Sequence, residues 1–214
     1  MKRTRIKICG ITRDEDLATT LRAGADAVGF VFYPPSARYV SVEKARALEL
    51  QIPPFVTRVG LFVNARPEDV VNVLHTVPID LLQFHGDEDA DYCKQFRRPW
   101  IKAIRVRSGV DLLKSAREFS SAQALLLDAY VDGYGGGGEA FDWGMIPDEL
   151  GIPVILSGGL HPGNIGDAVA RVRPWAVDVS SGVEVAGGPK GIKDPRRIEE
   201  FIAGVRNADA RLAL

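Results

Sequence analysis

The chain has 214 residues, of which 46% are hydrophobic and 26% are charged, as in an ordinary globular domain with a sizeable core. Its 27 Lys and Arg residues nearly balance its 28 Asp and Glu residues. This balance argues against nucleic-acid and membrane-surface partners, because proteins that bind them carry a positive excess.

Eight short apolar runs alternate with segments of helical pattern. The runs are Arg5–Cys9, Ala27–Phe32, Thr57–Val63, Asp80–His85, Trp100–Val106, Ala124–Ala129, Pro153–Leu156 and Ala176–Ser180. The expected helix starts lie at Thr12, Ser41, Pro67, Asp87–Asp89, Ser108–Val110, Asp142-Trp143, Asn164 and Asp194-Pro195. Eight strand–helix repeats predict an α/β fold, a single (β/α)₈ TIM barrel over residues 1–214 with its active site at the C-terminal face of the strands. A doubly wound open sheet is the structural alternative.

Within the predicted strands, alternate residues share a face, and one face of each strand is aliphatic. The aliphatic face should pack against the helices, so the other face should point into the barrel. The residues expected inside include Lys7, Cys9, Leu81, Gln83, His85, Leu126, Asp128, Asp178 and Ser180. Lys7 and Asp178 lie on neighbouring strands of a closed barrel, and we expect them to pair, since an unpaired buried charge costs several kcal/mol.

Two glycine-containing segments, Ser157–Leu160 and Asp178–Glu184, follow the last two predicted strands. Glycine lets backbone N–H groups approach an anion, and a helix N-terminus adds about half a positive charge. The loops after the seventh and eighth strands are the usual phosphate-binding place of a barrel. The sequence therefore predicts a phosphorylated substrate. The alternative is that these glycines only form tight turns.

Cys9 ends the first strand and Asp128 ends the sixth, both facing inward. A lone cysteine is often a small core side chain, and an inward carboxylate can be the structural partner of a Lys or Arg. A thiol and a carboxyl group across one rim are also the base and the acid that proton transfer on a sugar requires. We predict these catalytic roles, and we expect Lys7 to favour the thiolate of Cys9 with a pKa near or below about 8.5. Cys93 lies in a helix outside the barrel.

Two loops bear on this site. The segment Pro34–Tyr39 carries Arg38, whose guanidinium suits a carboxylate-bearing ligand, although an arginine in a loop is often only solvated. The segment Tyr130–Phe141 contains the consecutive glycines Gly135–Gly138 and follows Asp128. A lid that excludes water is one interpretation of this segment, and a disordered surface loop is the other.

Several motifs then resemble one enzyme family in order along the chain. They are Lys-Ile-Cys-Gly-Ile at 7–11, Gly-Phe-Val-Phe at 29–32, Ser-Ala-Arg-Tyr-Val-Ser at 36–41, Gln-Phe-His-Gly at 83–86, Leu-Leu-Asp at 126–128, Phe-Asp-Trp at 141–143, Ser-Gly-Gly-Leu at 157–160 and Asp-Val-Ser-Ser-Gly-Val-Glu at 178–184. Together they resemble phosphoribosylanthranilate isomerase over nearly the whole chain. Two loops depart from the family pattern: Gly137 replaces a Thr or Ser, and Val185–Lys190 is inserted before Gly-Ile-Lys-Asp. We expect these changes to affect loop closure and rate rather than the reaction.

The resemblance implies an Amadori rearrangement of N-(5-phosphoribosyl)anthranilate in tryptophan biosynthesis, with Asp128 as acid and Cys9 as base. It implies that Arg38 binds the anthranilate carboxylate and that Gln83 and His85 line the floor of the site. The phosphate-binding residues would be Gly158, Gly159, Ser180, Ser181 and Gly182. The related aldose isomerase of the histidine pathway is an alternative, although it has an aspartate in place of Cys9. A non-catalytic phosphate-binding barrel within a biosynthetic complex is the other, although it would have no need of Cys9 and Asp128.

The expected partner is a small phosphorylated substrate, with no nucleic acid or membrane, and the chain is expected to be a monomer or a homodimer. No redox cofactor is expected, because no electrons leave the substrate. Two cysteines and three scattered histidines do not form the ligand cluster of a zinc site, so no metal is expected. The N-terminal residues do not have the pattern of a signal peptide and no apolar run reaches the length of a membrane span, which predicts a cytoplasmic protein with free thiols.

Overall fold

The structure is a computed structural model that describes residues 3–129 and 140–213. Eight parallel strands pair in chain order, and β8 pairs with β1 to close a barrel. The strands are β1 (Arg5–Cys9), β2 (Ala27–Val31), β3 (Thr57–Phe62), β4 (Leu81–Phe84), β5 (Trp100–Val106), β6 (Leu125–Ala129), β7 (Val154–Leu156) and β8 (Ala176–Val179). The predicted (β/α)₈ barrel is confirmed.

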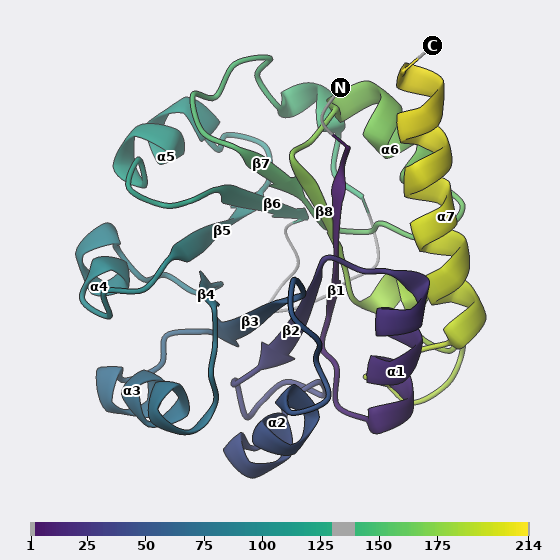
Figure 1. The fold of residues 1–214 in the computed structure, drawn as a ribbon. Coiled ribbons are helices and arrows are strands. Elements are labelled where there is room, and N and C mark those ends of the chain that lie inside the picture. Colours follow the sequence, from purple (N-terminus) through teal and green to yellow (C-terminus); the bar gives the residue numbers. More distant parts are fainter. Residues whose placement is uncertain (1–2, 130–139, 214) are drawn as a thin grey trace.

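Seven α-helices and two short 3₁₀ helices, η1 and η2, connect the strands of the described residues. They are α1 (Asp14–Ala23), α2 (Val42–Glu49), α3 (Pro67–Thr76), α4 (Ala90–Lys94), α5 (Leu112–Glu118), η1 (Trp143–Met145), α6 (Ile165–Val172), η2 (Ser181–Val183) and α7 (Pro195–Leu212). Figure 1 shows the α-helices as a ring around the strands, with the long helix α7 beside α1 and α6.

The sixth helix begins at Asp142-Trp143 and is short, as predicted, but in the described residues between β6 and β7 it is a 3₁₀ helix and not an α-helix. This segment forms only η1, where the Asp142 carboxylate accepts a hydrogen bond from the N–H of Gly144 (2.9 Å). Gly144 is a poor helix former, and Pro147 disfavours helical backbone at the residue before it. The turn therefore ends at Met145 instead of growing into an α-helix.

Local capping agrees with the sequence at some helices and differs at others. The Ser41 hydroxyl accepts a backbone N–H bond at the start of α2 (3.2 Å), as predicted. Thr12 does not cap α1: the cap position is Arg13, and the Thr12 hydroxyl donates to the Gly191 carbonyl (3.5 Å). The acidic first turn Asp14–Asp16 instead complements the positive end of the α1 dipole.

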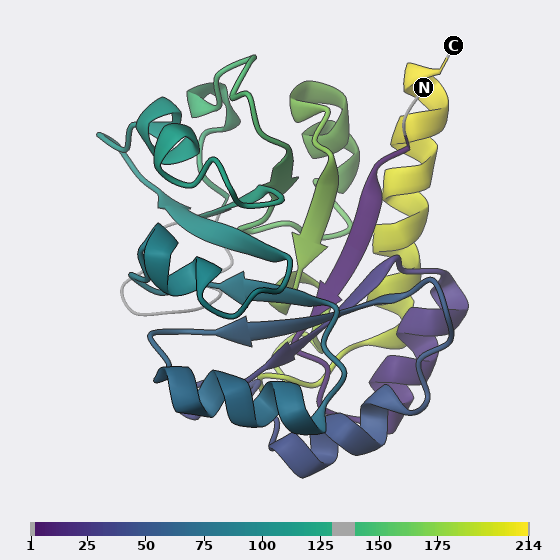
Figure 2. The same ribbon diagram turned by 60° about the vertical axis from the view of Figure 1, so that its left-hand side comes forward.

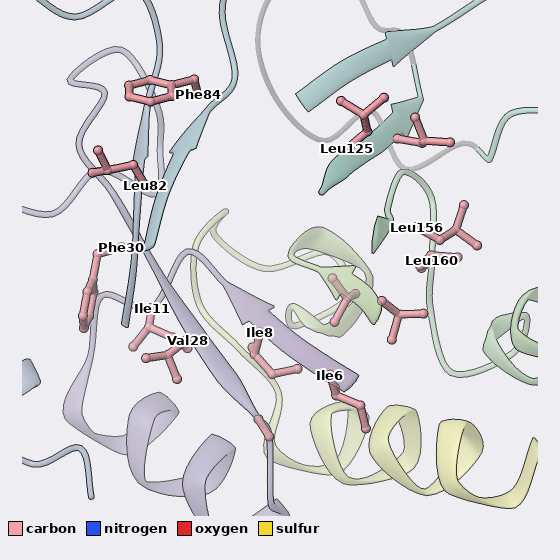
Figure 3. Packing of buried hydrophobic residues seen from close by; sticks show 14 of the residues in the cluster. Ile6, Ile8, Ile11, Val28, Phe30, Leu82, Phe84, Leu125, Leu156 and Leu160 are labelled. Atoms are coloured by element: carbon pink, nitrogen blue, oxygen red, sulfur yellow. The ribbon is translucent and has the colours of Figure 1, made fainter. Parts of the chain in front are cut away.

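The strand side chains separate into two cores, as their alternation predicts. The larger core lies between the strands and the helices, and Figure 3 shows Ile6 and Ile8 of β1 within it. The smaller core lies inside the barrel and consists of Ile101, Ala103, Ala124, Leu126, Ile155 and Ala176, with Leu81 packed against it. The predicted inward direction of Leu81 and Leu126 is confirmed, and the apolar plug leaves the polar inward residues at the C-terminal ends of the strands.

The beginning and the end of the described chain lie side by side, as Figure 2 shows for β1 and α7. The Thr4 N–H and hydroxyl donate to the two carboxylate oxygens of Asp209 in α7, at 2.8 and 2.7 Å. None of the helices in the described residues combines the length and the apolar character that a membrane span requires.

Candidate active site

A pocket with about 700 Å³ of empty space, its solvent-filled mouth included, lies at the C-terminal ends of the strands, where the barrel architecture predicts the chemistry. Every residue that the sequence assigns to the site lines this pocket: Cys9, Arg38, Gln83, His85, Asp128, Gly158, Gly159, Ser180, Ser181 and Gly182. A wall that the sequence did not predict completes it, formed by Val31, Leu61 and Val63, which cluster with Cys9. The pocket therefore combines polar groups with an apolar surface.

Cys9 stands above a buried ion pair. Its side chain is 4% exposed at the end of β1. Two residues earlier, Lys7 faces Asp178 of β8 in register, and 2.8 Å separates Nζ from Oδ1. The predicted pair is confirmed, and both of its charges are buried beneath the pocket.

The thiol of Cys9 is under opposing influences. Burial is the largest of them and raises its pKa above the ordinary value, although the positive charges of Lys7 and Lys193 act to lower it. Lys7 favours the thiolate, as predicted, but burial outweighs it, so the expectation of a thiol pKa near or below the reference value is wrong. Burial would lower the pKa of Lys7 itself, but the Asp178 carboxylate and Cys9 outweigh it and the pKa is raised, so Lys7 remains a cation.

Asp128 is linked to β4 by a chain of side-chain hydrogen bonds. Its Oδ2 lies 3.0 Å from Nε2 of His85, and Nδ1 of the same ring lies 3.0 Å from Nε2 of Gln83. The amide nitrogen of Gln83 donates to Nδ1, which leaves Nε2 as the ring nitrogen that bears a proton toward Asp128. His85 therefore donates to the carboxylate of Asp128, and this hydrogen bond holds Oδ2 in place.

The glycine loops after β7 and β8 require their glycines. Gly158 has a φ of +80°, and a Cβ there would lie 2.2 Å from a backbone nitrogen of β6. A Cβ at Gly182 would lie 1.8 Å from the carbonyl oxygen of Leu160, so the two loops touch. In the described part of the chain, the N–H groups of Gly159, Ser181 and Gly182 have no hydrogen-bond acceptor. Backbone N–H groups that line a pocket and lack a protein acceptor suit an anion.

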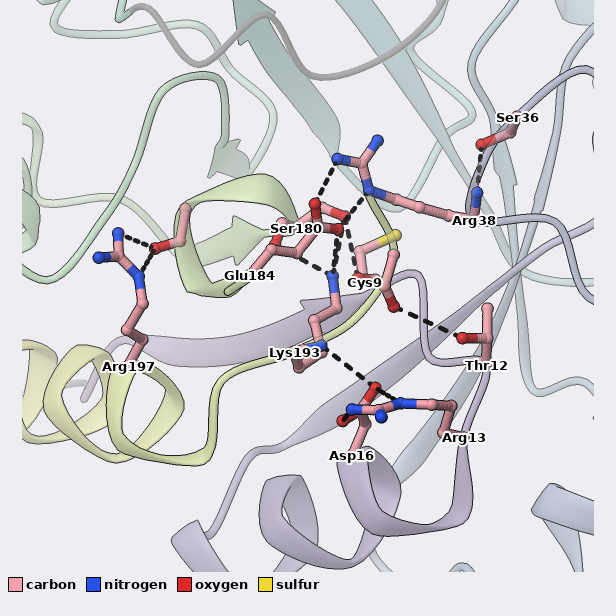
Figure 4. A network of polar contacts seen from close by, with 12 residues as sticks. Cys9, Thr12, Arg13, Asp16, Ser36, Arg38, Ser180, Glu184, Lys193 and Arg197 are labelled. Atoms are coloured by element: carbon pink, nitrogen blue, oxygen red, sulfur yellow. Dashed lines mark hydrogen bonds and ion pairs between the residues drawn. The ribbon is translucent and has the colours of Figure 1, made fainter. Parts of the chain in front are cut away.

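Arg38 is buried rather than solvated. Its Nε and Nη2 donate to the two carboxylate oxygens of Glu184, at 2.7 and 3.0 Å. Figure 4 shows the ammonium of Lys193 reaching the same carboxylate from another side, with 3.2 Å between Nζ and Oε1. Sequence reasoning gave neither Glu184 nor Lys193 a role. The only indication in the sequence that they have a role is that they lie in the Val-Glu and Gly-Ile-Lys-Asp segments of the family pattern.

Three further predictions concern the surroundings of the pocket. The proposed lid with Gly135–Gly138 lies outside the described residues, except for its last two positions. The inserted segment Val185–Lys190 lies in a loop whose base is an antiparallel bridge between Glu184 and Lys193. Within residues 3–129 and 140–213, no three His, Cys, Asp or Glu side chains are grouped as metal ligands.

Known proteins resemble this chain along nearly its whole length. A family model described as N-(5'phosphoribosyl)anthranilate (PRA) isomerase matches residues 6–204. The N-(5'-phosphoribosyl)anthranilate isomerase of Dechloromonas aromatica is 59% identical over 207 residues, which are 97% of this chain and 98% of that protein. The solved phosphoribosyl anthranilate isomerase of Thermotoga maritima has a TM-score of 0.87 and 44% identity, covering 95% of this chain and 99% of its own. A phosphoribosyl anthranilate isomerase in complex with reduced 1-(o-carboxyphenylamino)-1-deoxyribulose 5-phosphate has a TM-score of 0.84 and 41% identity, with coverage of 95% and 99%.

Proposed function

The chain belongs to the N-(5'-phosphoribosyl)anthranilate isomerase family, and from this premise we propose how its own side chains carry out the reaction. The enzyme converts N-(5-phosphoribosyl)anthranilate into 1-(2-carboxyphenylamino)-1-deoxyribulose 5-phosphate in tryptophan biosynthesis. This Amadori rearrangement opens the ribose ring, removes a proton from C2 and adds one at C1. It therefore calls for a positioned acid and a positioned base.

Asp128 is the general acid of the proposed mechanism. It protonates the ring oxygen of the ribose, the bond from that oxygen to C1 breaks, and the nitrogen lone pair forms a Schiff base. The hydrogen bond from His85 holds Oδ2, so Oδ1 is the oxygen that carries the proton. A Cβ at Gly158 would lie 2.9 Å from Oδ1, and glycine at this position leaves that space to the substrate.

Cys9 is the general base. Its thiolate removes the proton from C2, and the resulting enolamine becomes the ketone when C1 gains a proton and the hydroxyl on C2 loses one. The ammonium of Lys7, on the same strand, lowers the free energy of the thiolate and offsets part of the cost of its burial. The base and the acid stand on β1 and β6, so they approach the sugar from different sides.

The remaining residues of the pocket bind the two anionic groups and the ring of the substrate. Gly158 and Gly159, together with the loop 180–182, are proposed to bind the phosphate through backbone N–H groups. Arg38 is proposed to bind the anthranilate carboxylate. The apolar wall beside Cys9 offers a surface for the aromatic ring, and Gln83 and His85 form the floor.

The observation that carries the proposal is that Cys9 and Asp128 line the same pocket as both glycine loops. Turnover of freshly made substrate, followed by loss of anthranilate-type fluorescence, tests it. Cys9→Ala and Asp128→Asn should each lose roughly a hundred- to ten-thousand-fold in turnover while circular dichroism shows a folded protein. Cys93→Ala is the control, because Cys93 is buried in the outer core and away from the pocket. A folded Cys9→Ala protein with near-normal turnover would remove the thiol from the mechanism.

Complementation of a tryptophan auxotroph that lacks this step extends the test to the cell. Neither a histidine-pathway aldose isomerase nor a silent phosphate-binding barrel would restore growth. We further propose that residues 1–214 form one domain, as a monomer or homodimer, and that the protein works in the cytoplasm. The reducing cytosol would keep Cys9 a free thiol, as a base requires.

A further inference from the structure

The guanidinium of Arg38 lines the pocket with one edge already bound. Glu184 accepts from its Nε and Nη2, at 2.7 and 3.0 Å, in the two-point geometry that fixes the plane of a guanidinium. Among the described residues, Nη1 has no hydrogen-bond partner. Arg38 is therefore held in one orientation, with its other edge available to a ligand.

This pairing creates a problem of charge, because a carboxylate that binds Arg38 also cancels the charge that attracts a substrate carboxylate. Lys193 compensates for it. Its side chain is 0% exposed, and its Nζ lies 3.2 Å from Oε1 of Glu184. Burial, the largest influence, would raise the pKa of the Glu184 carboxyl, but Arg38 and Lys193 outweigh it and hold that pKa below its ordinary value. Burial lowers the pKa of Lys193, and the Glu184 carboxylate opposes that shift. With Lys193 in its ammonium form, the two cations and one carboxylate leave the cluster with a net positive charge.

Lys193 is anchored to the strands that carry the site. Its Nζ donates to the carbonyl and hydroxyl oxygens of Ser180, at 3.0 and 3.2 Å. The Ser180 hydroxyl in turn donates to the carbonyl of Cys9 (3.0 Å). The cluster around Arg38 is thus tied to the end of β1, where the proposed base stands, and Figure 4 shows these side chains converging.

We propose that Glu184 and Lys193 are positioning residues that make this enzyme select a substrate with a carboxylate. Glu184 orients Arg38, and Lys193 supplies the charge that Glu184 would otherwise cancel. This inference rests on the proposed role of Arg38 in binding the anthranilate carboxylate. The competing explanation is that the pair only closes the loop after β8. In that case its loss would change stability and leave ligand selectivity unaltered.

Two competitive inhibitors separate these explanations: anthranilate, which has the carboxylate without the phosphate, and inorganic phosphate. Glu184→Gln keeps the size of the side chain and loses its charge and one acceptor oxygen. Lys193→Met removes the compensating charge. For both variants we expect the anthranilate inhibition constant and the substrate KM to rise roughly tenfold or more. In Glu184→Gln, kcat and the phosphate inhibition constant should change much less. Lys193→Met should also lower kcat, because Lys193 lowers the pKa of the Cys9 thiol and donates to Ser180. Lys190→Met is the matched control, because this exposed lysine of the same loop carries the same charge.

Arg38→Met, measured in parallel, tests the carboxylate-binding role of Arg38 separately from the positioning role of Glu184 and Lys193. If it leaves anthranilate inhibition unchanged, the proposed role of Arg38 is wrong. If it weakens anthranilate binding while Glu184→Gln and Lys193→Met do not, only the positioning role is wrong. Tighter anthranilate binding in Glu184→Gln would also overturn that role, since Glu184 would then only reduce the charge of Arg38. Should Lys193→Met fail to fold, Glu184→Gln decides alone.

Discussion

Removing either partner of the ion pair between Lys7 and Asp178 should lower the free energy of unfolding by a large amount. Its charged atoms are 2.8 Å apart, and the side chains are 6% and 7% exposed. Asp178→Asn leaves the ammonium buried beside a neutral amide, and Lys7→Met leaves the carboxylate without its cation. Removing one partner of such a pair costs about 3–5 kcal/mol. In a domain of this size that corresponds to a fall in Tm of roughly 6–20 °C.

Urea denaturation followed by circular dichroism measures these losses, and a double-mutant cycle of Lys7→Met, Asp178→Leu and Lys7→Met/Asp178→Leu measures the coupling. The double variant should lose less free energy of unfolding than either single variant, because an apolar pair leaves no uncompensated charge. Arg66 and Asp69 provide the control: their ion pair has a similar length, 2.9 Å, with side chains 77% and 53% exposed. Arg66→Met should change the free energy of unfolding very little, because a solvent-exposed ion pair contributes little to stability. Single losses at Lys7 and Asp178 as small as this, or losses that simply add in the double variant, would refute the reasoning.

Three other predictions follow from the geometry. Gly182→Ala should weaken inhibition by inorganic phosphate and lower Tm, because the added Cβ would lie 1.8 Å from the Leu160 carbonyl oxygen. Gly166→Ala is the control and should do neither, because no atom lies within 4 Å of the added Cβ. Burial raises the pKa of Tyr92 from 10.0 to about 12, so the fold favours the neutral phenol. The free energy of unfolding should therefore fall between pH 10 and about 12. An ultraviolet titration in which the Tyr92 phenol ionises with a pKa near 10 would contradict this. In wild-type enzyme, kcat/KM should still rise with pH above the ordinary range of a thiol, since burial raises the pKa of Cys9. A plateau already reached at pH 7 would contradict a raised thiol pKa.

The sequence predicts the barrel and the inward residues of the site because both depend on local patterns. Alternation with a period of two places Cys9 and Asp128 inside, and the same parity places Lys7 opposite Asp178 once the barrel closes. Arg38 and Glu184 are 146 residues apart, and nothing in the local pattern of either indicates the other. A charged residue such as Lys193 is normally solvated, so its complete burial depends on partners that only the tertiary structure supplies.

The closure of the barrel also has a consequence for how the chain is made. β1 gains its second neighbour, β8, only after almost the whole sequence has been translated, and Asp209 of α7 then fastens Thr4. At roughly 5–20 residues per second, one edge of β1 stays unpaired for about 10–40 s on the ribosome. Such an edge can recruit strands from neighbouring nascent chains. A circularly permuted gene that joins α7 to β1 and begins at another loop would transfer this exposure to a different strand and leave the finished barrel unchanged.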